Sequence, residues 1–262
     1  MIIAGAPDVP TLHAEAPDGV LVAYRRFAGE RATDAADAAP PVLLVHGFAT
    51  TARVTWEGTG WVRALQAAGR DVIVTDLRGH GDSDKPVDAA SYGRDRLGDD
   101  LVAVLDSAGV EVVDAVGYSL GGRIVSALTG RASGRVRRVV IGGAGPSELF
   151  ATWDPEEARG LLLRGAPPRN PVIAQVLRPA LESGADREAL LACIEGIAGA
   201  PLELPSELAA LFVVGELDPV PAGVEQLARD RGSDVITVPG RDHVSTLTSR
   251  TFKDAAIGFL AG

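Results

Sequence analysis

Residues 112–123 read VVDAVGYSLGGR, and this stretch decides the fold class of the chain. A β-favouring apolar run at 112–116 leads directly into a serine set among glycines, and a segment of helical spacing follows. A serine at such a strand-to-helix turn has a strained backbone that leaves no room for side chains two residues before and after it, and Gly117 and Gly121 supply that room. The motif predicts an exposed Ser119 hydroxyl at a helix amino terminus, whose partial positive charge favours an oxyanion.

On both sides of this motif, strand-like runs alternate with segments of helical length. The runs lie at 20–27, 42–45, 71–75, 136–141, 210–214 and 234–238, and the helical segments lie around 60–68, 91–108, 120–131, 222–230 and 247–260. This alternation predicts an α/β fold with a mostly parallel central sheet flanked by helices. Such sheets bind ligands in the loops beyond the carboxyl ends of their strands. The Ala- and Asp-rich stretch at 30–40 is interpreted as a surface loop.

One interval breaks the alternation. From about Gly145 to Pro205 no β-rich run occurs, and eight prolines stand among short helical patterns. We interpret this interval as a small helical cap inserted between two strands. The expected organisation is a core in two parts, 1–144 and 206–262, with the cap at 145–205.

Composition excludes several classes of partner. The 262 residues carry a formal net charge of −10, from 35 acidic and 25 basic residues, and no cluster of Lys and Arg is present that could bind nucleic acid or an anionic membrane surface. The opening MIIAGAPDVP lacks the pattern of a signal peptide, and no apolar run approaches the length of a membrane span. The single Cys193 can form no internal disulfide. A freely soluble, cytoplasmic protein is expected.

Ser119 needs a base, because a serine hydroxyl is a weak nucleophile at neutral pH. His243, in GRDH, follows the strand-like run at 234–238 and would lie on a loop at the carboxyl end of the sheet. Asp218, in VVGELDP, also follows a strand and would hold the histidine tautomer and stabilise the imidazolium. Glu216, two residues earlier, is the alternative carboxylate; we favour Asp218.

Two backbone N–H groups are expected to form an oxyanion hole. One is that of Leu120, immediately after the nucleophile, and the other is that of Phe48 in the His-Gly-Phe turn after the run at 42–45. We interpret His46 and His80 as loop anchors, and His13 lies before the expected core.

The motifs HGF, DLRGHGDSDKP, GYSLGG, GELDPV and GRDH together resemble those of the α/β-hydrolase superfamily in order and approximate spacing over residues 42–243. The resemblance implies the α/β-hydrolase fold, triad residues in the order serine, aspartate, histidine, and a capped hydrolase that acts on a carbonyl compound without a cofactor. DLRGHGDSDKP looks like the stretch shared with haloalkane dehalogenases and epoxide hydrolases. Those relatives carry aspartate as nucleophile, so Ser119 excludes their alkyl-ester chemistry.

A narrower resemblance concerns GYSLGGR. It is similar to the menaquinone-pathway SHCHC synthase, which eliminates pyruvate and whose corresponding arginine contacts an anionic substrate. Arg123 would carry that role here; the alternative is a surface or salt-bridged helix residue. Tyr118 and, in the cap, Trp153 are further candidates for substrate contact.

The function expected from the sequence is hydrolysis of a carboxylic ester, thioester or lactone through an acyl-enzyme. The alternatives are carbon–carbon bond hydrolysis or SHCHC-synthase-like elimination by the same triad, and a non-catalytic relative that only binds a ligand. A small-molecule carbonyl compound is the expected partner. Neither a metal nor another cofactor is expected, because the sequence contains no Cys and His cluster at metal-ligand spacing and no GxGxxG fingerprint after the first strand.

Overall fold

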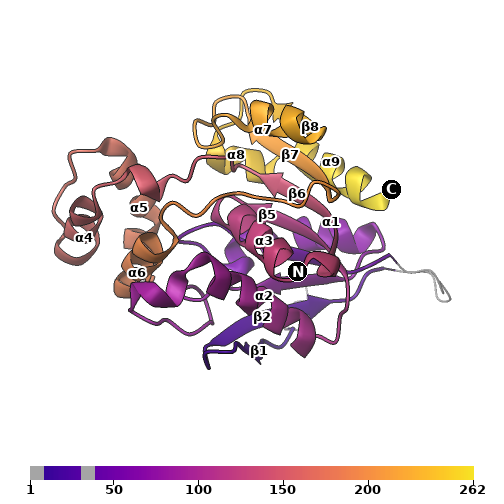
Figure 1. Ribbon diagram of the computed structural model, residues 1–262, viewed down its shortest axis with the longest axis horizontal. Coiled ribbons are helices and arrows are strands. Elements are labelled where there is room, and N and C mark those ends of the chain that lie inside the picture. Colours follow the sequence, from indigo (N-terminus) through magenta and orange to yellow (C-terminus); the bar gives the residue numbers. More distant parts are fainter. Residues whose placement is uncertain (1–8, 31–38) are drawn as a thin grey trace, which may run out of the picture.

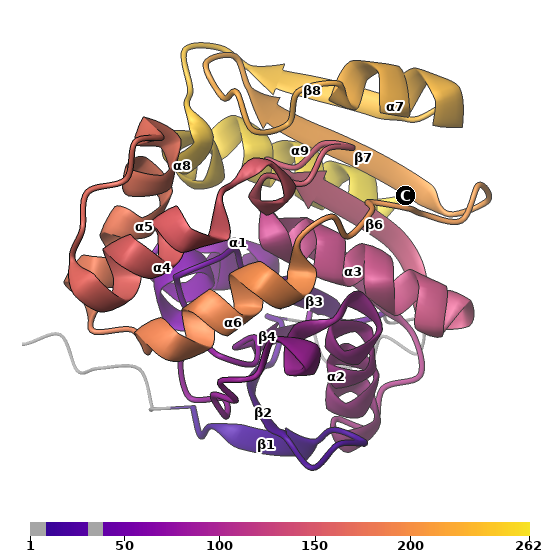
Figure 2. The same cartoon turned by 60° about the vertical axis from the view of Figure 1, so that its left-hand side comes forward.

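The computed structural model describes residues 9–30 and 39–262. Its centre is an eight-stranded sheet in the order β1-β2-β4-β3-β5-β6-β7-β8 (Figures 1 and 2). β2 pairs antiparallel with both β1 and β4, and the remaining neighbours pair parallel. This confirms the predicted α/β class with a mostly parallel sheet. Most of the expected surface loop at 30–40 lies outside the described residues.

The elements follow the predicted order with small shifts at their ends. The strands are β1 (Leu12–Glu15), β2 (Leu21–Phe27), β3 (Val42–Val45), β4 (Val72–Thr75), β5 (Val113–Tyr118), β6 (Val136–Gly142), β7 (Ala209–Gly215) and β8 (Asp234–Val238). The helices are α1 (Trp61–Ala67), α2 (Arg94–Ser107), α3 (Leu120–Arg131), α4 (Pro155–Arg164), α5 (Pro171–Ser183), α6 (Arg187–Ile197), α7 (Val224–Arg231), α8 (His243–Thr248) and α9 (Arg250–Ala261). Short helical turns lie at Arg53–Glu57, Ala89–Tyr92, Ser133–Arg135 and Phe150–Thr152.

Two expectations need correction. The prediction missed β1, a four-residue edge strand with a single buried side chain, whose alternating pattern is too short to stand out. His13 therefore belongs to the sheet rather than to a segment before the core. His243 is the first residue of α8 rather than a loop residue.

The sheet is buried on both faces because its central strands alternate apolar side chains between two clusters. In β3, for example, Leu43 and Val45 pack into one cluster while Val42 and Leu44 pack into the other, and all four are fully buried. Helices α2, α3 and α7 contribute to the first cluster, and α1 and α9 contribute to the second. Continuous apolar strands of this kind are typical of parallel sheets covered on both faces.

Helices α4, α5 and α6 gather at one side of the sheet (Figures 1 and 2). They occupy the interval between β6 and β7, and the described residues there form no strand. Local signals set their ends: the side chains of Asp154, Asn170 and Asp186 accept hydrogen bonds from first-turn N–H groups. Proline occupies the first position of α4 and α5, and Gly165 and Gly184 end these two helices in the left-handed conformation.

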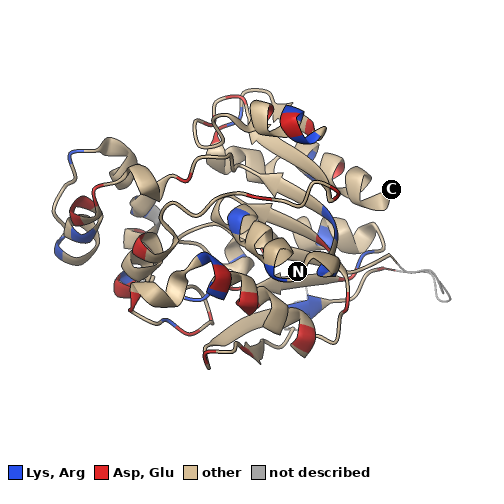
Figure 3. Cartoon of the chain, viewed as in Figure 1, with Lys and Arg blue, Asp and Glu red and all other residues tan. Residues whose placement is uncertain are grey.

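Figure 3 shows acidic and basic residues interspersed along the helices in this view. None of the helices in the described ranges is long and apolar enough to cross a bilayer.

Candidate active site

Ser119 lies in a strained turn between β5 and α3. Its φ is +54° and its ψ is −119°, and Ala49 is the other non-glycine residue with positive φ in the described part of the chain. The turn is fixed by hydrogen bonds from the Ser119 N–H to the Gly142 carbonyl, at 2.7 Å, and from the Gly122 N–H to the Ser119 carbonyl, at 3.0 Å. Positive φ at a non-glycine residue is costly, and residues held this way often occupy functional sites.

Gly117 and Gly121 are required because other backbone atoms lie too close to leave room for a Cβ. A Cβ on Gly117 would stand 2.6 Å from the Gly121 carbonyl oxygen, and a Cβ on Gly121 would stand 2.1 Å from the carbonyl oxygen of Val45. These contacts are with backbone atoms, which cannot move aside as a flexible side chain can. As expected from the sequence, glycine is needed at positions 117 and 121 because a Cβ there would clash with the backbone.

His243 and Asp218 form the second half of the site. The side chain of Asp218, which is 0% exposed, accepts a hydrogen bond at Oδ2 from His243 Nδ1 at 2.8 Å and another at Oδ1 from the Val220 N–H at 3.0 Å. A carboxylate can only accept, so Nδ1 carries the proton and Nε2 is left as the basic nitrogen. His243 itself is held at the start of α8 by a capping box between Asp242 and Ser245.

The alternative carboxylate, Glu216, is exposed and accepts the Gly240 N–H at 2.7 Å. Both acids follow β7, but the structure brings Asp218 to the imidazole.

The carboxyl end of β6 lies between the nucleophile and the base. The Gly142 carbonyl accepts the Ser119 N–H, and a Cβ on Gly143 would stand 3.1 Å from His243 Cε1. Ser119 and His243 therefore occupy the same end of the sheet. Within the described residues no hydrogen bond joins Ser119 Oγ to His243; such contacts are often long in substrate-free enzymes and shorten in the complex.

The two expected oxyanion donors lie beside Ser119. Leu120 is the first residue of α3, so its N–H has no acceptor within the helix. A Cβ on Gly47 would stand 3.3 Å from Ser119 Cβ, which places the turn carrying Phe48 against the nucleophile. In the described ranges, the Phe48 N–H donates to no protein acceptor.

Tyr118 contacts His243 through its ring and its hydroxyl. Its ring lies 5.3 Å from that of His243 between centroids, and its hydroxyl donates to the His243 carbonyl. Burial raises the pKa of this phenol, which therefore remains a donor at neutral pH.

Arg123 is 6% exposed and hydrogen-bonds to the chain both before α4 and after α6. Its guanidinium donates to the Gly145 carbonyl at 2.7 Å, to the Ser147 carbonyl, and to the Ala200 carbonyl at 2.9 Å. The residue is therefore neither on the surface nor joined to a carboxylate by a direct ion pair. Burial lowers the pKa of the guanidinium, and the nearby Glu148 carboxylate opposes that shift.

Glu148 was not anticipated from the sequence. Its buried carboxylate accepts the N–H groups of Phe150, Ala151 and Gly199, at 2.8, 2.8 and 3.2 Å, and so also joins the segment before α4 to the segment after α6. A lone glutamate between a proline and an aromatic residue gives no signal of such a role.

Aromatic rings connect the turn that carries Phe48 to the segment before α4. The ring of Phe150 lies 5.0 Å from that of Phe48 and 4.9 Å from that of Trp153, both edge to face. Trp153 is buried, and its indole N–H has no acceptor among the residues that the structure describes. A buried donor without an acceptor is costly, so a group that supplies one would bind favourably there.

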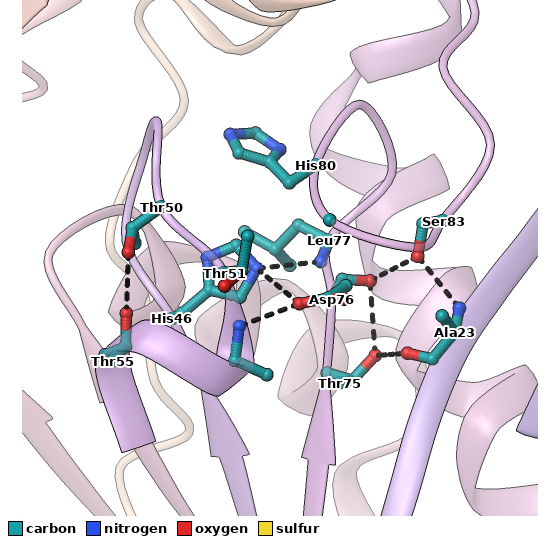
Figure 4. A network of polar contacts seen from close by, with 12 residues as sticks. Ala23, His46, Thr50, Thr51, Thr55, Thr75, Asp76, Leu77, His80 and Ser83 are labelled. Atoms are coloured by element: carbon teal, nitrogen blue, oxygen red, sulfur yellow. Dashed lines mark hydrogen bonds and ion pairs between the residues drawn. The ribbon is translucent and has the colours of Figure 1, made fainter. Parts of the chain in front are cut away.

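His46 and His80 anchor loops, as expected. His46 Nε2 accepts the Leu77 N–H at 3.1 Å and its Nδ1 donates to the Gly47 carbonyl at 2.7 Å, while His80 Nε2 accepts the Ala49 N–H at 3.1 Å. Each histidine follows one strand and holds the loop that follows the neighbouring strand. Figure 4 shows His46 and Leu77 in this arrangement, with His80 above them.

Asp76 adds a third connection that sequence reasoning missed. Its carboxylate accepts the Ala52 N–H at 2.7 Å and the Asp82 N–H at 3.0 Å. The signal was present, since Asp76 directly follows the strand at 72–75, where polar side chains of a parallel sheet meet. Within the described residues, no group of three or more His, Cys, Asp and Glu side chains is arranged to hold a metal ion.

Comparison with known proteins agrees with this architecture. Residues 40–192 match the model of the alpha/beta hydrolase fold family. A 2-hydroxymuconate semialdehyde hydrolase from Pseudomonas sp. (strain CF600) is 41% identical over 119 residues, which are 43% of this chain and 41% of that protein. The matches to the first curated relatives thus span less than half of the relatives' own length.

Solved structures match nearly the whole chain. The enol-lactonase from Burkholderia xenovorans LB400 has a TM-score of 0.74 at 22% identity, covering 96% of this chain and all of that one, which shows a common fold. Est816, described as an N-acyl homoserine lactone degrading enzyme, has a TM-score of 0.70 at 26% identity, covering 95% of this chain and all of that one. With the family model matching more than half of its length, this chain belongs to the α/β-hydrolase fold family.

Proposed function

We propose that this chain is a serine hydrolase that cleaves a carboxylic ester, thioester or lactone. The observation that carries the proposal is the 2.8 Å hydrogen bond between Asp218 and His243 at the end of the sheet where Ser119 is held in its strained turn. A pure binding protein has no need for these three groups together. The likeness to Est816, described as a lactone-degrading enzyme, favours the same chemistry.

The first half of the reaction forms an acyl-enzyme. Ser119 Oγ attacks the carbonyl carbon as its proton passes to His243 Nε2, and the buried Asp218 carboxylate stabilises the imidazolium. The N–H groups of Phe48 and Leu120 donate to the oxyanion of the tetrahedral intermediate. Collapse of that intermediate breaks the bond to the leaving group, which takes the proton from His243.

The second half repeats the sequence with water. His243 removes a proton from water, which attacks the acyl carbon, and the same two N–H groups stabilise the second tetrahedral intermediate. Return of the proton to Ser119 Oγ releases the acid and restores the enzyme. Nucleophile, base and oxyanion donors all come from the chain.

For substrate binding we propose that residues 145–205 act as a cap over a core formed by 1–144 and 206–262. The contacts between the rings of Phe48 and Phe150, and between those of Phe150 and Trp153, support a partly apolar wall beside the oxyanion hole. Trp153 would donate its unpaired N–H to a polar atom of the substrate. Since the polar atoms of Tyr118 and Arg123 already bond backbone carbonyls, we assign them to supporting the base and the cap. The single cysteine favours a cytoplasmic location.

A second candidate is cleavage of a carbon–carbon bond, or elimination, by the same triad. It is favoured by the 41% identity to a relative named as a hydrolase of a semialdehyde rather than of an ester.

The proposal is tested with a fluorophosphonate probe and a panel of p-nitrophenyl esters. Wild-type protein should be labelled and should hydrolyse short esters, and Ser119→Ala should abolish both while retaining the native circular dichroism spectrum. Ser147→Ala, which removes an exposed hydroxyl from the cap stem, is the matched control and should label normally. Labelling that persists in Ser119→Ala would identify another nucleophile. Labelling without hydrolysis of any ester or lactone would favour the second candidate.

A further inference from the structure

Ala49, directly after the proposed oxyanion donor Phe48, has a backbone conformation that needs support. Its φ is +56°, in the left-handed region that non-glycine residues rarely adopt. The support comes from His80, whose Nε2 accepts the Ala49 N–H at 3.1 Å. His80 Nδ1 donates to the Arg78 carbonyl at 3.0 Å, so the tautomer that leaves Nε2 as an acceptor is fixed.

His80 also retains this role over a wide pH range. It is 4% exposed, and burial together with the neighbouring His46 lowers its pKa to about 3. The imidazole of His80 is therefore neutral at neutral pH, and a neutral ring is needed to accept an N–H.

Because of the bond to His80, the Ala49 N–H has an acceptor and, within the described residues, the neighbouring Phe48 N–H does not. The Ala49 N–H points to His80, while the preceding Phe48 N–H has no acceptor among the described residues and lies on the turn that approaches Ser119. The Phe48 ring also packs against the His80 ring, with centroids 5.7 Å apart. The His80 side chain thus contacts both Phe48, through its ring, and Ala49, through its N–H.

We propose that His80 is a positioning residue for the oxyanion hole, acting through Ala49 to orient the Phe48 N–H toward the reacting carbonyl. The inference rests on the proposed function. His80 does not touch the substrate, and its contribution belongs to the transition state, because the oxyanion is absent from the bound substrate and develops on the way to the tetrahedral intermediate.

Three variants separate the two hydrogen bonds of His80. In His80→Gln the side-chain carbonyl reaches toward the position of Nε2 and can accept the Ala49 N–H. In His80→Asn the shorter amide reaches only the position of Nδ1 and can serve the Arg78 carbonyl. His80→Leu keeps the volume and removes both bonds.

The matched control is Ser83→Ala, in the same loop. Ser83 is equally buried, and its hydroxyl bonds the Ala23 N–H and the Asp76 carbonyl but makes no bond to the turn at 46–49. We expect Ser83→Ala to lower the melting temperature and to leave kcat unchanged at a temperature where the protein is folded.

The readouts are kcat and KM on a p-nitrophenyl ester, the rate of fluorophosphonate labelling, and hydrogen exchange of the Ala49 amide. We expect His80→Leu and His80→Asn to lower kcat about 10- to 100-fold with KM nearly constant, since misplacing an oxyanion donor costs less than the 10²–10³ lost on removing one. Labelling should slow in parallel, and Ala49 should lose protection. His80→Gln should retain more activity than His80→Asn, a comparison that remains available where His80→Leu fails to fold.

The inference is overturned if folded His80→Asn keeps kcat within twofold of wild type, if it retains as much kcat as His80→Gln, or if Ser83→Ala loses as much. An inactive, unlabelled wild-type protein would instead overturn the proposed function, so the two failures are distinguishable.

Discussion

Replacing Arg123 by methionine tests whether this residue holds the cap or binds substrate. Methionine keeps the length of the buried stem but removes the donors to the carbonyls of Gly145, Ser147 and Ala200. A hydrogen bond to a charged group contributes about 1.5–3 kcal/mol net. Because Ser147 is exposed, water can replace the donor at its carbonyl, and the loss should be near two such bonds, about 3–6 kcal/mol.

That loss is large enough to measure by thermal melting. For a chain of this size, 1 kcal/mol shifts Tm by about 2–4 °C, so the expected decrease is on the order of 10 °C. Arg131→Met is the control, because Arg131 lies on the same helix but is half exposed, and among the described residues its ion pair is with Asp99 at 2.7 Å. Exposed ion pairs contribute little, so this variant should melt close to wild type.

Activity on two substrates completes the test. In folded Arg123→Met, kcat/KM toward a short neutral ester should change by less than about tenfold, equivalent to 1.4 kcal/mol. Limited proteolysis should cut the stems near 145–147 and 200 faster than in wild type. An unchanged Tm would refute the assignment of Arg123 as a cap anchor. A much larger loss on a carboxylate-bearing substrate than on its neutral ester would show instead that Arg123 binds an anion.

Three further predictions concern the triad, metal ions and the cysteine. Asp218→Asn should lower kcat by orders of magnitude, up to the roughly 10⁴ seen when a triad histidine is held in the wrong tautomer, whereas Glu216→Gln should have little effect; the reverse order in steady-state kinetics would exchange their roles. Ester hydrolysis should survive exhaustive dialysis against EDTA, because the proposed mechanism draws every reacting group from the chain, and recovery of a lost activity by a divalent ion would contradict it. Burial raises the pKa of Cys193 to about 12, so the native thiol is protonated at pH 8 and should resist iodoacetamide, reacting only after unfolding when followed by mass spectrometry.

Local pattern was sufficient for most of the fold. β3 and β8 occur as predicted, and α3 begins directly after Ser119, because runs of β-favouring residues and a steric requirement for glycine act over only a few neighbouring residues. The edge strand β1 was missed because four residues with one buried side chain carry too little pattern.

The sequence identified candidate site residues by their positions directly after strands. It did not show which way their side chains face. Asp218 and Glu216 both follow β7, and the folding of the chain beyond Gly215 decides that only Asp218 meets His243. Similarly, the sequence places Arg123 one helical turn after Ser119 without showing what it faces. Its acceptors lie 22 to 77 residues away, before α4 and after α6.

The sequence by itself therefore determined the α/β class, the order of the elements and the strained serine turn, because short-range sterics and hydrophobic periodicity control these features. Only the tertiary structure decided which carboxylate contacts His243 and which backbone groups bond to Arg123 and His80. A hydrogen bond such as that from Ala49 to His80 joins residues 31 positions apart, and it exists only once β3 and β4 lie side by side in the sheet.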